Sequence, residues 1–456
     1  MRFDAIVIGS GQGGNPLAHR LADLGRTVAL IERKHLGGTC INTGCTPTKA
    51  MVASAQVAHY ARNAARWGIR ASSITADMKA IVARKNEVVQ SFRSGQERRV
   101  AERKTLQLFH GQAQFRAAHE LEVAGQVLES EQIFIDTGCR PSLPSMAGLD
   151  KAPYLTNETI LELQELPECL LVLGGGYIGL EFGQIFHRFG SRVIVVNRGP
   201  EILPREDPEV ASELKKALEA EGLEFRLNRQ TKQVDADGTR VTLRIEGSQG
   251  QETVSGSHLL VATGRVPNVE DLHLEKGGVR TNEKGFIQVN ERLETNVPGI
   301  WALGDVNGGP AFTHISYNDF QIIYGNLVEG KSLSTRDRIV PYSVFTDPQL
   351  GGVGMTEREA KAKGYRLKIG NIPTANVARA IERGETAGLM KIVVNASDDR
   401  ILGASILSAD GGELVQILHA IMLANQPYTV LKGAIYIHPT MAEGFFGLME
   451  SVSPVN

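Results

Sequence analysis

The chain has 456 residues, of which 49 are Gly, 42% are apolar and only 4 are Cys. Its 49 Lys and Arg against 51 Asp and Glu give a formal net charge of −2, which excludes a nucleic-acid binder that relies on a large positive field. So few cysteines exclude a disulfide scaffold, and no apolar run approaches the length of a transmembrane helix. Because a strand pattern begins within the first few residues, we expect no signal peptide and a cytoplasmic protein. The length suggests about three domains.

The first 32 residues predict a βαβ unit that binds a dinucleotide. An apolar strand at 3–8 leads into a glycine-rich turn, a helical pattern and a second strand that ends at Glu32. In the turn, Gly9 allows the tight bend, Gly11 lets backbone N–H groups approach a pyrophosphate, and Gly14 lets the helix pack on the sheet. Glu32 can accept hydrogen bonds from ribose hydroxyls. A glycine-rich loop without a ligand is the alternative, and the order strand, turn, helix, strand favours the dinucleotide.

Two cysteines, Cys40 and Cys45, follow this unit in the sequence LGGTCINTGCTPTK. Their spacing differs from the C-x-x-C spacing that is typical of zinc sites. Residues five apart in an ideal helix have Cα atoms roughly 8–9 Å apart, which exceeds the roughly 7 Å limit for a disulfide. A disulfide therefore requires a distorted turn, which Gly44 permits and Pro47 helps to end; two unrelated buried thiols are the alternative.

The whole βαβ unit returns 165 residues later, which indicates a second dinucleotide site. A strand at 170–173 leads into the sequence GGGYIG, and the second strand again ends 23 residues after the first glycine, at Asn197. The glycines of this second fingerprint are Gly174, Gly176 and Gly179.

The acidic residue of the first unit is replaced in the second by Asn197, which is followed by Arg198 and, seven residues further on, by Arg205. A carboxylate at this position suits a free ribose 2′-hydroxyl, whereas guanidinium groups favour a 2′-phosphate. We therefore predict NADPH rather than NADH as the second dinucleotide. The alternative is that both arginines are solvated surface charges.

The cysteine segment resembles the redox-active disulfide motif of the class I pyridine nucleotide–disulfide oxidoreductases, the family of glutathione reductase, dihydrolipoamide dehydrogenase and mercuric reductase. The resemblance covers essentially the whole chain. It implies FAD at the first unit, NADPH at the second, and electron transfer through a Cys40–Cys45 disulfide. By position, Cys40 resembles the thiol that attacks the substrate and Cys45 the thiol that lies against the flavin.

Further segments match family motifs in the same order. The sequence GGGYIGLEFG resembles the NAD(P)H site, which implies that Tyr177 covers the flavin and that Glu181 pairs with Lys49. Cys139 and Cys169 have no counterpart in the motifs and are expected to be structural. The resemblance assigns the following further residues to the cofactors: Thr39, Gly138, Gly264, Asp305 and Thr313, the last with the backbone of His314.

The sequence IHPTMAEG near the C-terminus admits two interpretations. In one, Pro439 opens a helix and Thr440 and Glu443 form its capping box. In the other, which the resemblance to the family motif H-P-T-x-x-E favours, His438 is the acid–base group for thiol exchange and Glu443 orients its ring. In the family this histidine completes the site of the partner subunit, so the resemblance implies a homodimer.

The substrate is less sharply defined. The chain has neither the vicinal C-terminal Cys pair nor the N-terminal C-x-x-C domain of many mercuric reductases, although 41–49 and 203–208 look most like mercuric-reductase relatives. The segment 304–320 also resembles flavoreductases of reactive-chlorine resistance, which act on hypothiocyanous acid or cupric ion. We predict a small disulfide or oxidised-sulfur substrate. The alternatives are reduction of Hg(II), Cu(II) or hypothiocyanous acid and, less favoured because of Asn197 and Arg198, a lipoyl-complex dehydrogenase subunit.

Together these patterns predict an α/β fold with two Rossmann-like dinucleotide-binding domains and an α+β C-terminal dimerisation domain. The FAD domain is expected at 1–150 and 265–335, the NADPH domain at 151–264 and the dimerisation domain at 336–456. We expect no metal ligands of the chain's own, and neither nucleic acid nor membrane as a partner.

Overall fold

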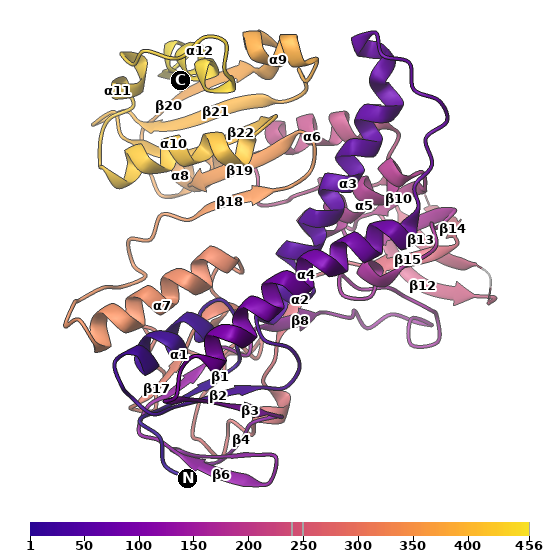
Figure 1. Ribbon diagram of the computed structural model, residues 1–456. Helices are drawn as coiled ribbons and strands as arrows, with labels where there is room; N and C mark the ends of the chain where they lie inside the picture. The colour runs from indigo at the N-terminus through magenta and orange to yellow at the C-terminus, as the bar shows by residue number, and fades with distance from the viewer. Residues whose placement is uncertain (239, 249, 456) are drawn as a thin grey trace.

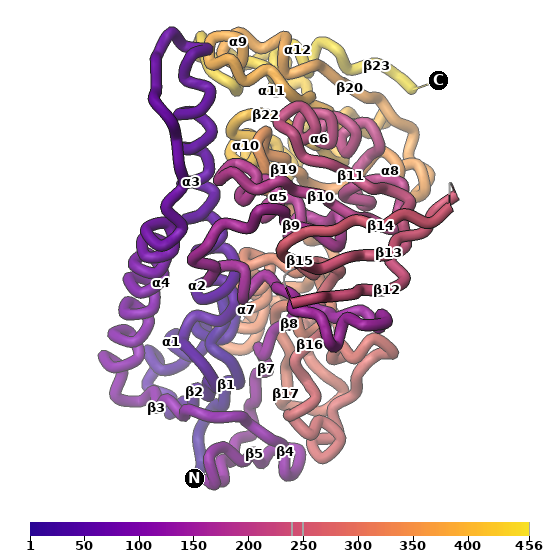
Figure 2. The backbone as a smooth tube through the Cα atoms, turned by 90° about the vertical axis from the view of Figure 1, so that its right-hand side faces the viewer, coloured from indigo at the N-terminus to yellow at the C-terminus, as the bar shows by residue number. Residues whose placement is uncertain are grey.

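A computed structural model describes residues 1–238, 240–248 and 250–455. They form three units, each built on its own main sheet, with the N-terminus at one end of the molecule and the C-terminus at the other (Figures 1 and 2).

The first unit contains a five-stranded parallel sheet in the order β17–β7–β1–β2–β3. Its strands are β1 (Ala5–Ile8), β2 (Val28–Glu32), β3 (Leu106–His110), β7 (Ile133–Ile135) and β17 (Ile300–Ala302). Strands β1 and β2 are buried throughout, which explains their continuous apolar sequences. Because β17 pairs with β7, a segment near residue 300 completes the sheet that the N-terminus begins.

Helices accompany this sheet and extend away from it. They are α1 (Gly14–Asp23), α2 (Gly38–Asn42), α3 (Cys45–Asn63), α4 (Met78–Ala101) and α7 (Thr313–Leu327). Two small antiparallel sheets are attached: β4 (Gln114–Ala117) with β5 (Glu120–Val123) and β6 (Gln126–Glu129), and β8 (Cys139–Pro141) with β16 (Arg265–Pro267). The hairpin of α3 and α4 runs along the molecule from the first unit towards the third (Figures 1 and 2).

The second unit repeats the parallel arrangement in a four-stranded sheet of order β11–β10–β9–β15. Its strands are β9 (Cys169–Leu173), β10 (Arg192–Val196), β11 (Glu224–Arg226) and β15 (His258–Val261), and its helices are α5 (Tyr177–Phe189) and α6 (Pro208–Glu221). An antiparallel sheet packs beside it, formed by β12 (Gln230–Ala236), β13 (Val241–Gly247) and β14 (Gly250–Gly256).

The third unit is an antiparallel six-stranded sheet of order β18–β19–β22–β21–β20–β23. The strands are β18 (Pro341–Val344), β19 (Gln349–Gly354), β20 (Leu367–Pro373), β21 (Leu389–Asn395), β22 (Ile401–Ser408) and β23 (Ser453–Pro454). The helices are α8 (Glu357–Ala362), α9 (Ala378–Arg383), α10 (Gly411–Leu423), α11 (Thr429–Lys432) and α12 (Gly444–Glu450). Short 3₁₀ helices connect the elements of the three units: η1 (Ala64–Trp67), η2 (Ile160–Glu162), η3 (Glu270–Leu272), η4 (Gly304–Asn307), η5 (Thr374–Asn376) and η6 (Met441–Glu443).

A shared hydrophobic cluster holds the cysteine-bearing end of α3 against the second unit. Met51 and Ala55 of α3 are buried together with Phe182 and Phe186 of α5. This contact places the first turn of α3 beside the first turn of α5, and so brings the cysteine segment to the second glycine-rich turn.

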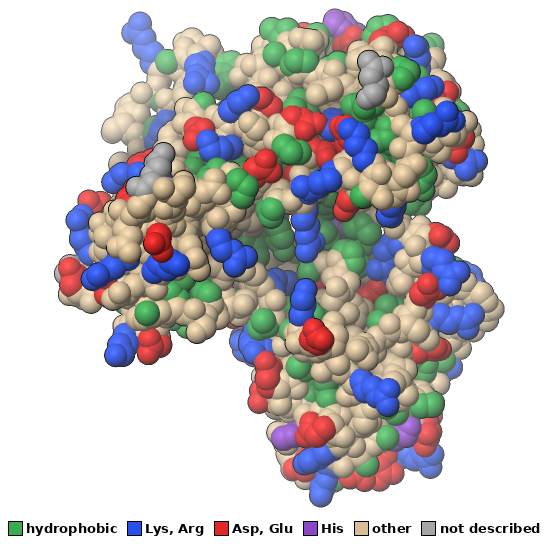
Figure 3. Space-filling view, turned by 180° about the vertical axis from the view of Figure 1, so that it is seen from behind, with side chains coloured by type: hydrophobic (Ala, Val, Ile, Leu, Met, Phe, Trp, Pro, Cys, Tyr) green, Lys and Arg blue, Asp and Glu red, His purple; other side chains and the backbone are tan. Residues whose placement is uncertain are grey.

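Among the described residues, no helix has the length and hydropathy that crossing a membrane would require. On the face seen in Figure 3, basic and acidic side chains are interspersed rather than gathered into one basic patch.

Candidate active site

The first glycine-rich turn is packed so closely that side chains have no room in it. A Cβ at Gly9, whose φ is +99°, would lie 2.2 Å from the carbonyl oxygen of Asp136, and one at Gly14 would lie 2.5 Å from the carbonyl oxygen of Gly9. A Cβ at Gly11 would meet the Asp136 carboxylate at 2.6 Å. Glu32, at the end of β2, accepts hydrogen bonds from the backbone and hydroxyl of Ser10 at 3.1 and 2.6 Å. The turn is thus shaped for close approach of a ligand to its backbone.

Asp136 is a residue of this site that the sequence analysis did not single out. It follows β7 directly and is buried, and its Oδ2 accepts a hydrogen bond from the Gly14 backbone at 2.7 Å. Burial raises the pKa of Asp136 well above its usual value. Its position at the carboxyl end of a buried parallel strand, where ligands of such sheets bind, is the signal that could have found it.

Cys40 and Cys45 lie on either side of a break between helices. Cys40 lies in α2 and Cys45 begins α3; between them Thr43 and Gly44 leave the helical conformation, with φ of −143° and −132°. The distorted turn therefore falls at Gly44 as predicted, whereas Pro47 lies inside the first turn of α3 rather than ending the bend. Both cysteines are free thiols in the structure, Cys40 half-buried and Cys45 exposed.

The two thiols have opposite acidities. A hydrogen bond from the Cys40 thiol, aided by Thr313 and the charge of Lys49, lowers the pKa of Cys45 to about 6, although burial opposes the shift. The same hydrogen bond and burial raise the pKa of Cys40. The Sγ of Cys45 lies 3.1 Å from the Thr313 hydroxyl at the start of α7. At neutral pH the pair is therefore a Cys45 thiolate beside a protonated Cys40 thiol.

A partly buried ion pair lies next to this pair of thiols. The Lys49 Nζ donates to the Glu181 carboxylate at 2.7 Å and lies 4.5 Å from the centre of the Phe345 ring. Glu181 is 4% exposed, and it also accepts the Phe345 backbone N–H at 2.8 Å. Tyr177 begins α5, one helical turn before Glu181, and burial raises the pKa of its hydroxyl. The ion pair thus joins α3 to α5 where the two units meet.

All of these groups border one cavity of about 2120 Å³. It extends from Glu32 and the first glycine turn, past Thr39 and the cysteines, to Tyr177 and Glu181. Other residues that line it are Gly138, Asp305, Thr313, His314 and Tyr342. The cavity therefore connects the first dinucleotide unit with the beginning of the second.

The residues around this cavity fit FAD. The crowded turn at Gly9 and Gly11 leaves only backbone to face a phosphate, and the half-buried Thr137 carries a hydroxyl oxygen that is buried without a hydrogen-bond partner among the described residues. Asp305 forms a 2.6 Å ion pair with Arg265, so its carboxylate is held at the cavity wall. Cys139 donates from Sγ to the Asp305 carbonyl at 3.4 Å, and burial raises its pKa to about 12, as expected for a structural thiol.

The second glycine-rich turn has the same crowding. Gly174 has a φ of +114°, and a Cβ at Gly179 would lie 2.3 Å from the Gly174 carbonyl oxygen. A Cβ at Gly176 meets no atom within 4 Å, so this side of the turn is open. Gly264, with a φ of +136°, connects β15 to β16. Within this unit, the beginning of α5 and residues 156–158 border the large cavity.

Asn197, Arg198 and Arg205 all follow β10 but have different environments. The Asn197 side chain accepts from the Gly175 backbone at 3.1 Å and donates to the Glu201 carbonyl at 2.8 Å. Asn197 thus ties the loop to the glycine turn. Arg198 and Arg205 are exposed, and neither forms an ion pair within the described part of the chain. Two exposed guanidinium groups without ion-pair partners beside an open glycine turn fit a phosphorylated ribose.

His438 and Glu443 contact each other but lie away from the cysteines of the same chain. The His438 Nδ1 is 3.0 Å from both carboxylate oxygens of Glu443, and the imidazole is 67% exposed. Thr440 makes no side-chain cap to η6, and its hydroxyl donates to the Ile437 carbonyl instead. The capping-box interpretation is therefore wrong, because the Glu443 carboxylate is engaged by the histidine. Neither His438 nor Glu443 lines the cavity.

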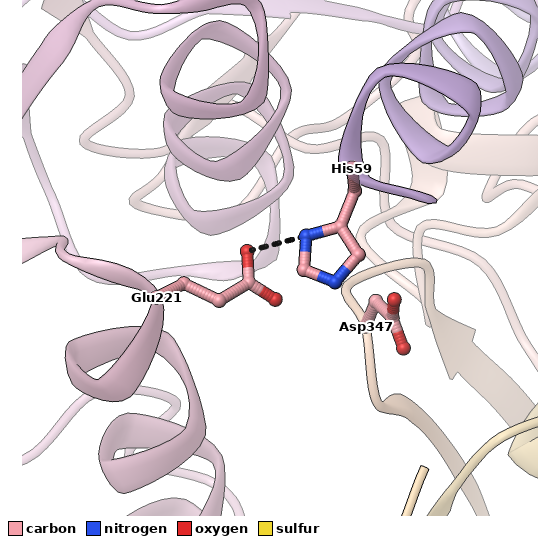
Figure 4. A group of neighbouring side chains, drawn as sticks. All are labelled: His59, Glu221 and Asp347. Atoms are coloured by element: carbon pink, nitrogen blue, oxygen red, sulfur yellow. Dashed lines mark ion pairs between the residues drawn. The ribbon is translucent and has the colours of Figure 1, made fainter. Parts of the chain in front are cut away.

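Two further clusters contain three potential metal ligands each, and in each cluster a basic side chain of the protein pairs with the carboxylates. Figure 4 shows His59 of α3 pointing towards Glu221 of α6 and Asp347 of the loop before β19. Arg188 donates to both carboxylates, at 2.9 Å to Glu221 and 2.7 Å to Asp347, and burial lowers the pKa of His59. The second cluster surrounds the buried amine of Lys391, and its members are Asp207, Glu209 and Glu357. Both clusters are ion-pair junctions between units.

Comparison with known proteins identifies the class. The family model "Pyridine nucleotide-disulphide oxidoreductase" matches residues 3–319, and the model of that family's dimerisation domain matches 340–447. The chain belongs to the pyridine nucleotide–disulfide oxidoreductase family, and it is a flavin-dependent oxidoreductase that acts on a sulfur group. The α/β fold is thereby confirmed, and the dimerisation domain supports a homodimer.

Relatives of three kinds cover nearly the whole chain. The probable pyridine nucleotide-disulfide oxidoreductase RclA of Escherichia coli is 37% identical and covers 99% of both chains. A dihydrolipoyl dehydrogenase of Thermus scotoductus is 38% identical, covering 99% of this chain and 97% of the relative, and a mercuric reductase of Lysinibacillus sphaericus is 34% identical, covering 97% and 81%. The solved Cu(II) complex of HOCl-induced flavoprotein disulfide reductase RclA from Escherichia coli superposes with a TM-score of 0.90 at 37% identity over 99% of both chains.

Proposed function

We propose that the chain is an NADPH:disulfide oxidoreductase that reduces a small disulfide or oxidised-sulfur compound through Cys40 and Cys45. The observation that carries this proposal is the position of Cys45, whose Sγ lies 3.1 Å from the Thr313 hydroxyl in the cavity that also contains the Lys49–Glu181 pair and joins the two dinucleotide units. When bound there, FAD accepts a hydride from the nicotinamide and passes two electrons to a disulfide. We propose FAD at 1–150 and 265–335, NADPH at 151–264 and dimerisation through 336–456, a division that the pairing of β17 with β7 supports.

The acidities of the thiols suggest how the dithiol is used. Cys40, the more basic thiol, loses its proton to a base and attacks one sulfur of the substrate disulfide, which releases the first thiolate. The Cys45 thiolate then attacks the Cys40 sulfur, which forms the Cys40–Cys45 disulfide and releases the second substrate thiolate. Each released thiolate takes up one proton. We propose that His438 of the partner subunit carries these protons and that Glu443 orients its ring.

A heterodimer tests the origin of the histidine. One subunit carries Cys45→Ser and the other His438→Gln, and the two variant homodimers are expected to be inactive. If the histidine acts within its own chain, each site of the heterodimer carries one of the two changes and both sites are inactive. If it acts across the interface, both changes fall in the same site. Because Cys45→Ser and His438→Gln then meet in one site, the other site is intact, and about half of the wild-type activity is expected. No recovered activity would contradict transfer of His438 between subunits.

The choice of dinucleotide rests on the loop after β10. We propose that Arg198 and Arg205 bind the 2′-phosphate of NADPH, while Asn197 holds the loop against Gly175. Converting Asn197 and Arg198 to Glu and Ala is expected to raise KM for NADPH and lower KM for NADH. An unchanged ratio of the two KM values would refute the proposal.

A metal ion or hypothiocyanous acid is the second candidate oxidant. It is favoured by the similarity to the Cu(II) complex of RclA and to mercuric reductases. Rapid-mixing reoxidation of the two-electron-reduced enzyme by small disulfides, Hg(II), Cu(II) and hypothiocyanous acid separates the candidates. The proposal expects disulfide or oxidised sulfur to react fastest, and faster reoxidation by a metal ion would overturn it. A preference for NADH over NADPH, combined with fast turnover of the lipoamide–dihydrolipoamide couple, would instead indicate a lipoyl-complex dehydrogenase.

A further inference from the structure

Glu206 is a buried carboxylate in which only one of the two oxygens has a hydrogen-bond partner among the described residues. It lies between β10 and α6 and is 5% exposed. Its Oε1 accepts a hydrogen bond of 2.6 Å from the Tyr342 hydroxyl, whereas its Oε2 is buried without a partner among the described residues. Buried carboxylates are normally satisfied at both oxygens, so this one invites a functional explanation.

The strand pairing of the third unit makes room for the Tyr342 side chain. Tyr342 of β18 lies directly opposite Gly352 of β19, and a Cβ at Gly352 would lie 2.1 Å from the phenol ring. The ring stacks on Phe312 with centroids 5.9 Å apart and an interplanar angle of 12°, and it lines the large cavity. The phenol therefore forms part of the flavin-side wall and directs its hydroxyl to Glu206.

On the other side, Glu206 ends the loop that carries the two exposed arginines. The loop is tied to the glycine turn ahead of Glu206, because Leu203 donates its backbone N–H to the Gly175 carbonyl at 3.0 Å. Its end is tied by the Glu206 backbone N–H, which donates to the Leu203 carbonyl at 2.9 Å, and by Glu206's bond to Tyr342. Arg205 lies immediately before this anchor and Arg198 lies near the start of the loop.

The charged groups around Glu206 come from several elements. Asp207 precedes α6 and accepts from the buried Lys391 at 2.9 Å. From α8, Glu359 adds a second negative charge, and Arg358 adds a positive one while donating to the Pro204 carbonyl at 2.9 Å. Burial, with the charges of Asp207 and Glu359, raises the pKa of Glu206 to about 7, and the bond from Tyr342 and the charge of Arg358 oppose the shift.

We propose that Glu206 and Tyr342 are a positioning pair for the 2′-phosphate end of the dinucleotide. Their hydrogen bond fixes the end of the arginine-bearing loop to the wall of the flavin cavity, so that the loop is ordered before the ligand arrives. Ordering a loop in advance lowers the entropic cost of binding, and here it benefits the group that the arginines contact. The inference rests on the proposed preference for NADPH.

The test measures binding of adenosine 2′,5′-bisphosphate and of 5′-AMP to the FAD-containing enzyme by calorimetry. The wild type is expected to bind the bisphosphate more tightly. Tyr342→Phe and Glu206→Leu are expected to weaken bisphosphate binding by about fivefold or more, the usual effect of one lost hydrogen bond, and to leave 5′-AMP binding unchanged within about twofold. Glu206→Gln, which keeps an acceptor for the Tyr342 hydroxyl, is expected to retain most of the affinity. KM for NADPH should follow the same order.

Tyr365→Phe, which removes the hydroxyl of an exposed tyrosine, is the matched control and is expected to bind both probes as the wild type does. If the wild type binds the two probes equally, the NADPH preference fails and the inference fails with it. If the wild type prefers the bisphosphate but Tyr342→Phe binds it equally well, the positioning pair alone is overturned. Tyr342→Phe decides this even if Glu206→Leu does not fold, because it removes a single hydroxyl from a half-buried ring.

Discussion

The pH dependence of stability offers a direct measurement of the Glu206 environment, independent of any ligand. Replacing Glu206 by Gln keeps the size of the side chain and an acceptor for Tyr342, but removes the titrating proton. Its pKa is raised from 4.5 to about 7 in the folded protein, mainly by burial. Between these two values the folded protein therefore binds a proton that the unfolded chain does not.

The sign and size of the effect follow from this difference. The protonated carboxyl stabilises the fold fully below the unfolded pKa, and this stabilisation is lost as the pH rises through the folded pKa of about 7. One pKa unit corresponds to about 1.4 kcal/mol, so protonation of Glu206 contributes about 3 kcal/mol to the free energy of unfolding at low pH. About 2.5 kcal/mol of this contribution is lost between pH 5 and pH 8. For a chain of 456 residues, the Tm difference between the wild type and Glu206→Gln should therefore change by about 3 °C between pH 5 and pH 8.

Thermal and denaturant unfolding of the wild type and Glu206→Gln at pH 5 and pH 8 measures this linkage. At pH 5 the variant is expected to be the less stable protein, because its amide places two N–H groups at the position of Oε2, which has no hydrogen-bond partner among the described residues. By pH 8 the wild type should have lost most of this advantage. Glu213→Gln, a half-buried position of α6 whose carboxylate pairs with the exposed Lys216, is the control and should show the same gap at both pH values. A gap for Glu206→Gln that does not change with pH would refute the reasoning.

Three further predictions concern other parts of the molecule. Cys40→Ala is expected to raise the pKa of Cys45 from about 6 towards 9, and Cys40→Ser, which keeps a hydroxyl donor, should raise it less; thiolate absorbance against pH measures this, and an unchanged pKa would contradict the hydrogen bond. Arg188→Met removes the guanidinium that bridges Glu221 and Asp347 and is expected to cost about 3–5 kcal/mol in denaturant unfolding, whereas a loss within the range of a surface ion pair would show that the junction is solvated. Gly352→Val is expected to displace the Tyr342 ring and raise KM for NADPH without changing kcat; unaltered kinetics would count against the packing described for these strands.

Local patterns in the sequence predicted much of the fold and part of the candidate site. The crowding at Gly9 and Gly174 is a property of the strand–turn–helix connection, so the glycine fingerprint announces it before any tertiary contact is known. The break between Cys40 and Cys45 is equally local, because five residues in an unbroken helix hold two thiols too far apart. The pairing of His438 with Glu443 spans only five residues.

Other features were not visible because their partners lie far apart along the chain. Glu206 and Tyr342 are separated by 136 residues, and Arg188 reaches Asp347 across 159. Asp136 takes part in the first glycine turn although it is 122 residues from Gly14. A single sequence records which residues such a strand or loop contains, but not which distant side chain will face them.

The sequence by itself determined two dinucleotide-binding units, the order of the motifs and the break between the paired cysteines, because each of these depends on neighbours within a few turns of chain. Only the tertiary structure shows why Cys45 is the more acidic thiol, since its acidity depends on its distance from Cys40, Thr313 and Lys49 after folding. It also decided that Glu206 is buried and half-satisfied, because that depends on how the second and third units pack together. Pairwise electrostatics and burial are properties of three-dimensional distance, and distance between remote residues is fixed only when the units meet.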